Sequence, residues 1–147
     1  MRKVDLLDNH YFIFLLLIIT AIITTISSIY FFSIMLAGIL FLAFMRCLKQ
    51  KAYYSLSFIL ISFLFVELNN GFKPFSLILL ATFVYTFIVP YIKRVISLRD
   101  LNNYVYIICF YIGIAIIWAL TVKSSFALVG MLLFNLLLDF IIFGFFI

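Results

Sequence analysis

Long apolar stretches, separated by short clusters of positive charge, constrain this chain more than any other feature of its sequence. The stretches are long enough for α-helices that cross a bilayer, which need roughly 20 apolar residues. The clusters contain Arg2, Lys3, Arg46, Lys49, Lys51, Lys93, Arg94 and Arg99. Short cytoplasmic loops keep Lys and Arg whereas exported loops are depleted of them, so this spacing predicts a polytopic membrane protein.

The composition indicates the same class. Hydrophobic residues make up 69% of the chain and charged residues only 10%. A soluble domain could not cover its surface with so few polar groups. The formal charge of +5 does not indicate a nucleic-acid partner, because the basic residues lie at the ends of apolar stretches and not along one face. We expect one transmembrane domain over residues 1–147, whose basic residues set the topology and contact anionic lipids.

The first apolar stretch, residues 11–45, is too long for one membrane helix. At about 1.5 Å per residue it would reach about 52 Å, against a hydrocarbon core of about 30 Å. Hydroxyl-bearing residues cluster at positions 24–30, and we expect the chain to turn there. The first helix is expected to be an uncleaved signal anchor, because more membrane sequence follows it.

The later apolar stretches complete an all-α bundle of six transmembrane helices. They are residues 53–66, 75–92, 104–122 and 126–147. If both termini are cytoplasmic, eight of the ten Lys and Arg residues are cytoplasmic, and only Lys73 and Lys123 face outward. A single tilted helix at the start would leave five spans and divide these charges six against four. The charge bias therefore favours six spans, with five as the alternative.

Two connections leave alternatives open. Residues 91–103 mix basic and apolar side chains, which is typical of a short helix on the inner leaflet or against a cytoplasmic partner, or of a solvated linker. Pro90 lacks a backbone donor, so it predicts either a kink in the fourth span or a helix end at the membrane interface.

Patterns that carry catalytic or metal chemistry are absent from the sequence. The one histidine, His10, precedes the first apolar stretch, and no zinc-protease, phosphate-loop or nucleophile-elbow motif occurs. Cys47 and Cys109 match no metal or redox spacing, and we expect two free thiols. The sequence therefore predicts a protein that is not an enzyme and that has no catalytic residue, cofactor or metal site.

Asp139 is the most informative polar residue, because it lies within the last apolar stretch. A carboxylate inside a membrane helix costs about 2.5 to 3.5 kcal/mol, so it usually faces protein, water or a partner. Asn135 lies four residues earlier on the same helix face. The pair predicts a packing or partner-binding stripe, or an ion or proton site. We favour the first reading, because ion pathways usually need several such groups.

Glu67 closes the third apolar stretch at its outer end. We expect either an ion pair with Lys73, which is close enough across the turn, or a solvated helix end. An exposed pair of this kind would contribute at most about 1 kcal/mol to stability.

Residues 65–71, FVELNNG, begin a pattern that resembles the rod shape-determining protein MreD. In that family an apolar third helix ends in an acidic-Leu-x-x-Gly turn and leads into an apolar helix that carries a tyrosine. Here the acidic residue is Glu67, where Asp is usual, the glycine is Gly71 and the tyrosine is Tyr85. Asn135 lies where the family often has an asparagine in its last span. These residues, with Asp139, are our candidates for partner-binding or intramembrane polar positions.

The resemblance implies a non-enzymatic scaffold subunit in the bacterial inner membrane that supports cell shape and peptidoglycan elongation. The implied partners are MreC, RodA, a class B penicillin-binding transpeptidase and the actin-like MreB filament, together with membrane lipids. One alternative is a small transporter, channel or permease subunit that uses Asp139 and Asn135. Another is an enzyme on lipid-linked substrates that uses Glu67 and the basic loops.

Overall fold

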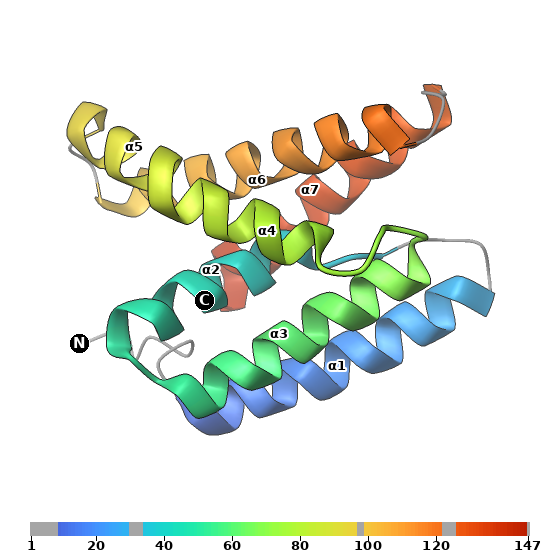
Figure 1. Ribbon diagram of the computed structural model, residues 1–147, viewed down its shortest axis with the longest axis horizontal. Helices are drawn as coiled ribbons and strands as arrows, with labels where there is room; N and C mark the ends of the chain where they lie inside the picture. Colours follow the sequence, from blue (N-terminus) through green and yellow to red (C-terminus); the bar gives the residue numbers. More distant parts are fainter. Residues whose placement is uncertain (1–8, 30–33, 97–98, 122–125, 147) are drawn as a thin grey trace.

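Eight helical segments make up the part of the chain that the structure describes, and no strand occurs in that part. The computed structural model describes residues 9–29, 34–96, 99–121 and 126–146. The segments are α1 (His10–Ile29), α2 (Ala37–Gln50), α3 (Tyr53–Asn69), α4 (Ser76–Phe83), η2 (Val84–Ile88), α5 (Val89–Val95), α6 (Arg99–Thr121) and α7 (Phe126–Phe146). Because α4, η2 and α5 follow one another without interruption, they form one long rod (Figure 1). The predicted all-α class is confirmed.

Within the described residues, four helices are long and apolar enough to cross a bilayer: α1, the rod from α4 to α5, α6 and α7. α3 is apolar but has 17 residues. α2 has 14 residues, so it is about 21 Å long, which is less than the roughly 30 Å of a hydrocarbon core. The chain is thus a helical membrane protein, whereas the total of six crossings stays a prediction.

The expected turn at residues 24–30 is wrong, because α1 continues through this region to Ile29. The Thr20 hydroxyl donates to the Leu16 carbonyl over 2.8 Å, and the Thr24 hydroxyl donates to the Thr20 carbonyl over 2.7 Å. These side chains are satisfied by their own helix, so they do not end it. Residues 34–36, just before α2, are not helical, and residues 30–33 lie outside the described residues.

The rod from α4 to α5 continues past Pro90 to Val95, so this proline does not mark a helix end at the interface. It follows the five-residue π-helical segment η2, whose wider turn accommodates a position where the usual backbone donor is missing. α6 already begins at Arg99. Of the alternatives left open for residues 91–103, a separate short helix is therefore wrong, because the described residues there belong to the end of α5, to Ile96 and to the start of α6; residues 97–98 lie outside the described residues.

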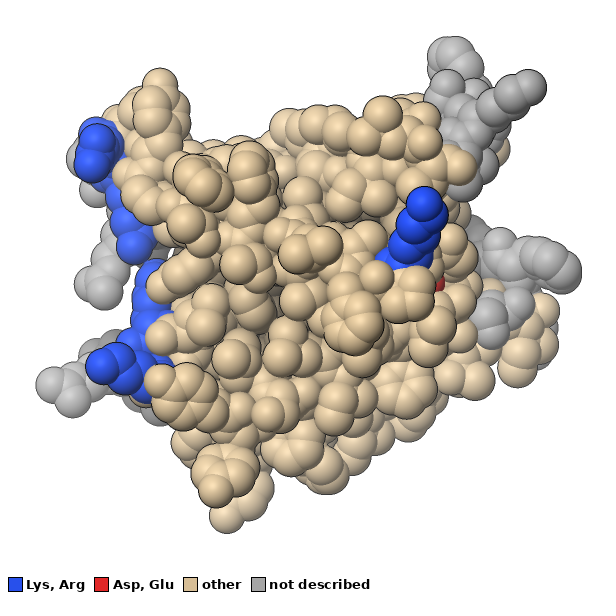
Figure 2. Space-filling model, in the orientation of Figure 1, with Lys and Arg blue, Asp and Glu red and all other residues tan. Residues whose placement is uncertain are grey.

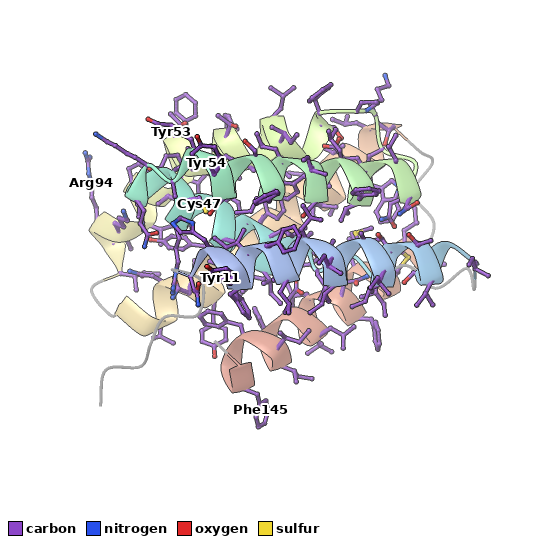
Figure 3. The ribbon with its side chains drawn as sticks, turned by 90° about the horizontal axis from the view of Figure 1, so that it is seen from below. Tyr11, Cys47, Tyr53, Tyr54, Arg94 and Phe145 are labelled. Carbon is purple, nitrogen blue, oxygen red and sulfur yellow. The ribbon has the colours of Figure 1, made fainter. Side chains whose placement is uncertain are left out.

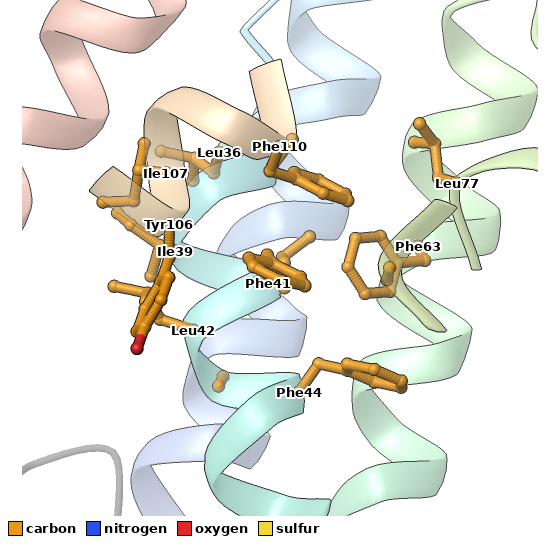
Figure 4. Close-up of a cluster of buried hydrophobic side chains, with 14 of the residues drawn as sticks. Leu36, Ile39, Phe41, Leu42, Phe44, Phe63, Leu77, Tyr106, Ile107 and Phe110 are labelled. Atoms are coloured by element: carbon orange, nitrogen blue, oxygen red, sulfur yellow. The ribbon is translucent and has the colours of Figure 1, made fainter. Parts of the chain in front are cut away.

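α2 occupies the centre of the bundle, between α3, α6 and α7 (Figure 1). Every residue from Ala37 to Met45 is buried. Phe41 stacks on Phe110 of α6 with ring centroids 4.6 Å apart, and Phe63 of α3 packs beside Phe110 (Figure 4). Since protein surrounds this helix, its short length and non-helical lead-in are tolerated inside the apolar layer.

The two ends of the bundle differ in charge. Lys49 lies in the last turn of α2, and Lys93 and Arg94 lie in the last turn of α5. On the face shown in Figure 2, Lys and Arg side chains gather mainly at one end. α1 begins, and α7 ends, at the end of the bundle where these basic side chains gather (Figure 1). The cytoplasmic location of both termini stays a prediction, since residues 1–8 and 147 are outside the described part.

Candidate functional site

Asn135 and Asp139 of α7 point at the beginning of α2. Their exposed fractions are 1% and 0%, so neither side chain reaches lipid or water at the surface. They lie on one face of α7 because they are four residues apart. The structure therefore brings the two predicted residues together, and it places a third element of the fold against them.

Both side chains accept hydrogen bonds from the backbone that leads into α2. The Met35 N–H donates to Asn135 Oδ1 over 2.9 Å, and the Gly38 N–H donates to Asp139 Oδ2 over 2.8 Å. Tyr111 of α6 donates its hydroxyl to the same Asp139 oxygen over 2.6 Å. Asn135 also donates from Nδ2 to the Met131 carbonyl over 3.0 Å. Together these contacts form a cap on α2 that we call the α2 cap.

The α2 cap solves a problem that the sequence creates locally. The first N–H groups of a helix have no partner within the helix, and inside an apolar layer no water replaces that partner. Leu36, at the N-cap position, has no side chain that can accept a hydrogen bond, and its backbone is left-handed with φ of 49°. The missing acceptors come from α7, and a carboxylate there also complements the positive end of the helix dipole.

Gly38 makes room for the carboxylate. A Cβ atom on this residue would lie 2.7 Å from Ile107 Cγ2 and 2.8 Å from Asp139 Oδ2. Neither approach is tolerable without movement, so glycine lets α2 lie directly against α6 and α7. Gly38 and Tyr111 are site residues that the sequence analysis missed. A glycine next to a helix break was the available signal for the first, and no sequence signal connected Tyr111 to Asp139.

The second carboxylate oxygen, Asp139 Oδ1, is buried and accepts no hydrogen bond from the residues that the structure describes. No group of three His, Cys, Asp or Glu side chains able to hold a metal ion lies together in those residues. Within the described residues, neither Cys47 nor Cys109 belongs to a disulfide. The chemistry available at the α2 cap is thus hydrogen bonding to one carboxylate and one amide.

Glu67 is buried, with an exposed fraction of 0%, so the expected solvated helix end is wrong. Its Oε2 accepts the Phe75 N–H over 2.6 Å. Its Oε1 accepts the N–H groups of Leu77 at 2.7 Å and Ile78 at 3.4 Å. The expected ion pair with Lys73 is also wrong within the described residues, because the start of α4 takes the carboxylate instead. We call this arrangement the α4 cap.

Gly71 shapes the turn that brings Glu67 to α4. Its φ of +72° lies in the left-handed region, where a Cβ atom is unfavourable. The Phe72 N–H donates to the Glu67 carbonyl over 3.0 Å and closes the turn. Tyr85, by contrast, lies in η2, half-buried against the core, and forms no hydrogen bond to Glu67 or Asp139. Of the residues singled out by the family resemblance, Tyr85 takes part in neither cap.

Comparison with protein-family models, curated proteins and solved structures found no match to this chain.

Proposed function

We propose that this chain is a non-enzymatic scaffold subunit of the bacterial inner membrane, similar to MreD. In this role it supports cell shape and peptidoglycan elongation through helix contacts with MreC and with the wall-synthesis enzymes RodA and a class B penicillin-binding transpeptidase, with the MreB filament as a further partner. The resemblance in residues 65–71 motivates the family, and the arrangement of polar groups is compatible with the role.

One observation carries the proposal: both carboxylates in the described apolar layer are used to cap helices of the same chain. Glu67 accepts three backbone N–H groups, and Asp139 accepts one backbone N–H and one hydroxyl. With both side chains fully buried, large hydrophobic side chains are exposed along every long helix. Such a bundle interacts with partners through helix packing, which is how a membrane scaffold assembles.

Copurification from native membranes in mild detergent tests this role. We expect the wild-type chain to bring down MreC or a wall-synthesis enzyme. We expect Asp139→Leu to lose that capture while it still inserts, because leucine makes the last span easier to insert but leaves α2 uncapped. Gly130→Ala is the matched control on α7, since a Cβ there meets nothing within 4 Å. Wild-type preparations free of every wall-synthesis protein would contradict the scaffold role.

The orientation can be tested separately. Lys49 or Arg94 is replaced by cysteine in a variant that lacks Cys47 and Cys109. Intact cells are then treated with a thiol reagent that cannot cross the membrane. We expect no labelling until the membrane is opened, because both positions belong to the cytoplasmic end in this proposal. Labelling in intact cells would show that these positions lie outside the cell. It would also exclude MreB, which is cytoplasmic, as a partner at this end.

A small transporter is the second candidate, and Asp139 Oδ1 is the observation that favours it. This oxygen has no hydrogen-bond partner among the described residues, and it lies at the start of a short helix inside the bundle. Discontinuous helices of this kind hold ions or substrates in some transporters. The candidate predicts that Asp139→Asn abolishes solute flux into reconstituted vesicles while the fold remains intact. If vesicles that contain the protein take up no solute faster than protein-free vesicles, the transporter candidate is ruled out.

A further inference from the structure

A positively charged surface formed by two separate parts of the chain covers one end of the bundle. Lys51 follows α2, and Lys93 and Arg94 lie in the last turn of α5; all three side chains are exposed. We call these three residues the basic patch. Arg46 and Lys49, on the last turns of α2, adjoin it. Figure 2 shows the basic side chains in a column across this end of the molecule.

The described part of the chain does not neutralise the basic patch. None of its three residues forms an ion pair there, and the carboxylates of Glu67 and Asp139 are buried in the two helix caps. The patch therefore offers its positive charge to something outside the described bundle. An anion is the complementary partner.

Exposed tyrosines place the basic patch at the depth of lipid headgroups. Tyr53 and Tyr54 begin α3 next to Lys51, and Tyr91 precedes Lys93 by two residues. Their exposed fractions are 69%, 89% and 69%, so they face the surroundings of the bundle. Figure 3 shows Tyr53, Tyr54 and Arg94 at the same end. Tyrosine is enriched at the boundary between membrane and water, because its ring is apolar and its hydroxyl is polar.

We propose that the basic patch binds the phosphate headgroup of an anionic phospholipid in the leaflet that it faces. Arginine presents a planar fork that matches two phosphate oxygens, and lysine supplies a mobile point charge. The apolar faces beside the patch accept the acyl chains of the same molecule. This inference goes beyond the scaffold role, because it needs no protein partner.

Native mass spectrometry of the full chain in a neutral detergent measures this binding. The protein is titrated with phosphatidylglycerol and, separately, with zwitterionic phosphatidylcholine. We expect tighter binding of phosphatidylglycerol, and we expect Lys93→Gln with Arg94→Gln to weaken it by about thirtyfold, or about fivefold for each charge removed. Lys73→Gln removes a described basic residue from the opposite end and should leave the affinity unchanged.

Equal affinity for the two lipids would overturn the proposal, as would an equal loss in Lys73→Gln. A poly-glutamate peptide that binds more tightly than phosphatidylglycerol would also overturn it, by assigning the patch to an acidic protein segment. Circular dichroism checks that the double variant remains folded. If it does not, Lys51→Gln provides the test, because this residue lies outside the helices, and an affinity within twofold of the wild type contradicts the proposal.

Discussion

Two helices of this protein begin in the same way and in different surroundings. α4 and α2 each follow a residue with a left-handed backbone and no capping side chain, Phe75 and Leu36. Each receives a carboxylate from another helix in place of the missing cap. Glu67 comes from 8 to 11 residues earlier in the chain, whereas Asp139 comes from 101 residues later. The first cap belongs to a turn, and the second holds distant parts of the fold together.

The two carboxylates are also used differently. Both oxygens of Glu67 accept backbone N–H groups, close to exposed residues such as Lys73 and Phe75. Asp139 uses one oxygen for a backbone N–H and for the Tyr111 hydroxyl, inside the bundle. Water can replace a lost cap near the end of the molecule but not one in its interior. The comparison therefore predicts that the α2 cap contributes more to stability than the α4 cap.

Asp139→Leu should have the largest effect. It leaves the Gly38 N–H and the Tyr111 hydroxyl buried without an acceptor, and we expect the free energy of unfolding to fall by about 3 kcal/mol. Asp139→Asn keeps one acceptor oxygen, so its loss should be about 1 kcal/mol. Unfolding in mixed detergent micelles measures both. Equal stability of the two variants would show that the carboxylate is not the cap that the geometry indicates.

Gly38→Ala sharpens the comparison by crowding the α2 cap without removing its acceptors. A new Cβ atom meets Ile107 and Asp139 below 3.0 Å, and overpacking of this kind should cost about 2 kcal/mol of unfolding free energy. Gly130→Ala should instead be neutral or stabilising by up to about 1 kcal/mol, since alanine favours the helix. Thermal unfolding of the pair separates the two results. Identical shifts would mean that α2 lies further from α7.

Glu67→Ala should cost less, about 1.5 kcal/mol, which is within the range for loss of a helix cap. Denaturant unfolding followed by circular dichroism measures it. Lys73→Gln serves as the control and should leave stability unchanged, because the carboxylate bonds to backbone groups instead of this lysine. A loss in Lys73→Gln as large as that in Glu67→Ala would restore the ion pair expected from the sequence.

Gly71→Ala should have the smallest effect, about 1 kcal/mol, because the turn needs a positive φ at this position. Gly71→Asn should lose less than that, since asparagine tolerates this conformation. The same unfolding measurement ranks the two variants. If alanine were tolerated as well as asparagine, the turn would not depend on this backbone angle.

Features that depend on residues close together in the sequence could be predicted from it. Apolar length predicted the all-α class and the approximate positions of the later helices, and Gly71 marked a turn. The break in the first stretch was misplaced because hydroxyl side chains were expected to end a helix. Thr20 and Thr24 instead donate to their own helix.

The α2 cap could be predicted only in part. An intramembrane Asp with an Asn four residues earlier indicated a polar contact of α7, but its target depends on how α2, α6 and α7 pack. Gly38 and Tyr111 are separated from Asp139 by 101 and 28 residues, so no local pattern connects them. Glu67 was misjudged for a related reason. Opposite charge favoured Lys73 as its partner, whereas the turn places the unpaired N–H groups of α4 next to the carboxylate.

The distance along the chain between α2 and its cap sets an order of events during biosynthesis. A ribosome adds about 5 to 20 residues per second, so Gly38 leaves it roughly 5 to 20 s before Asp139, which follows 101 residues later. During that interval the nascent α2 has no acceptor from α7. The α2 cap therefore forms only after α7 has been synthesised, although α2 itself is made much earlier.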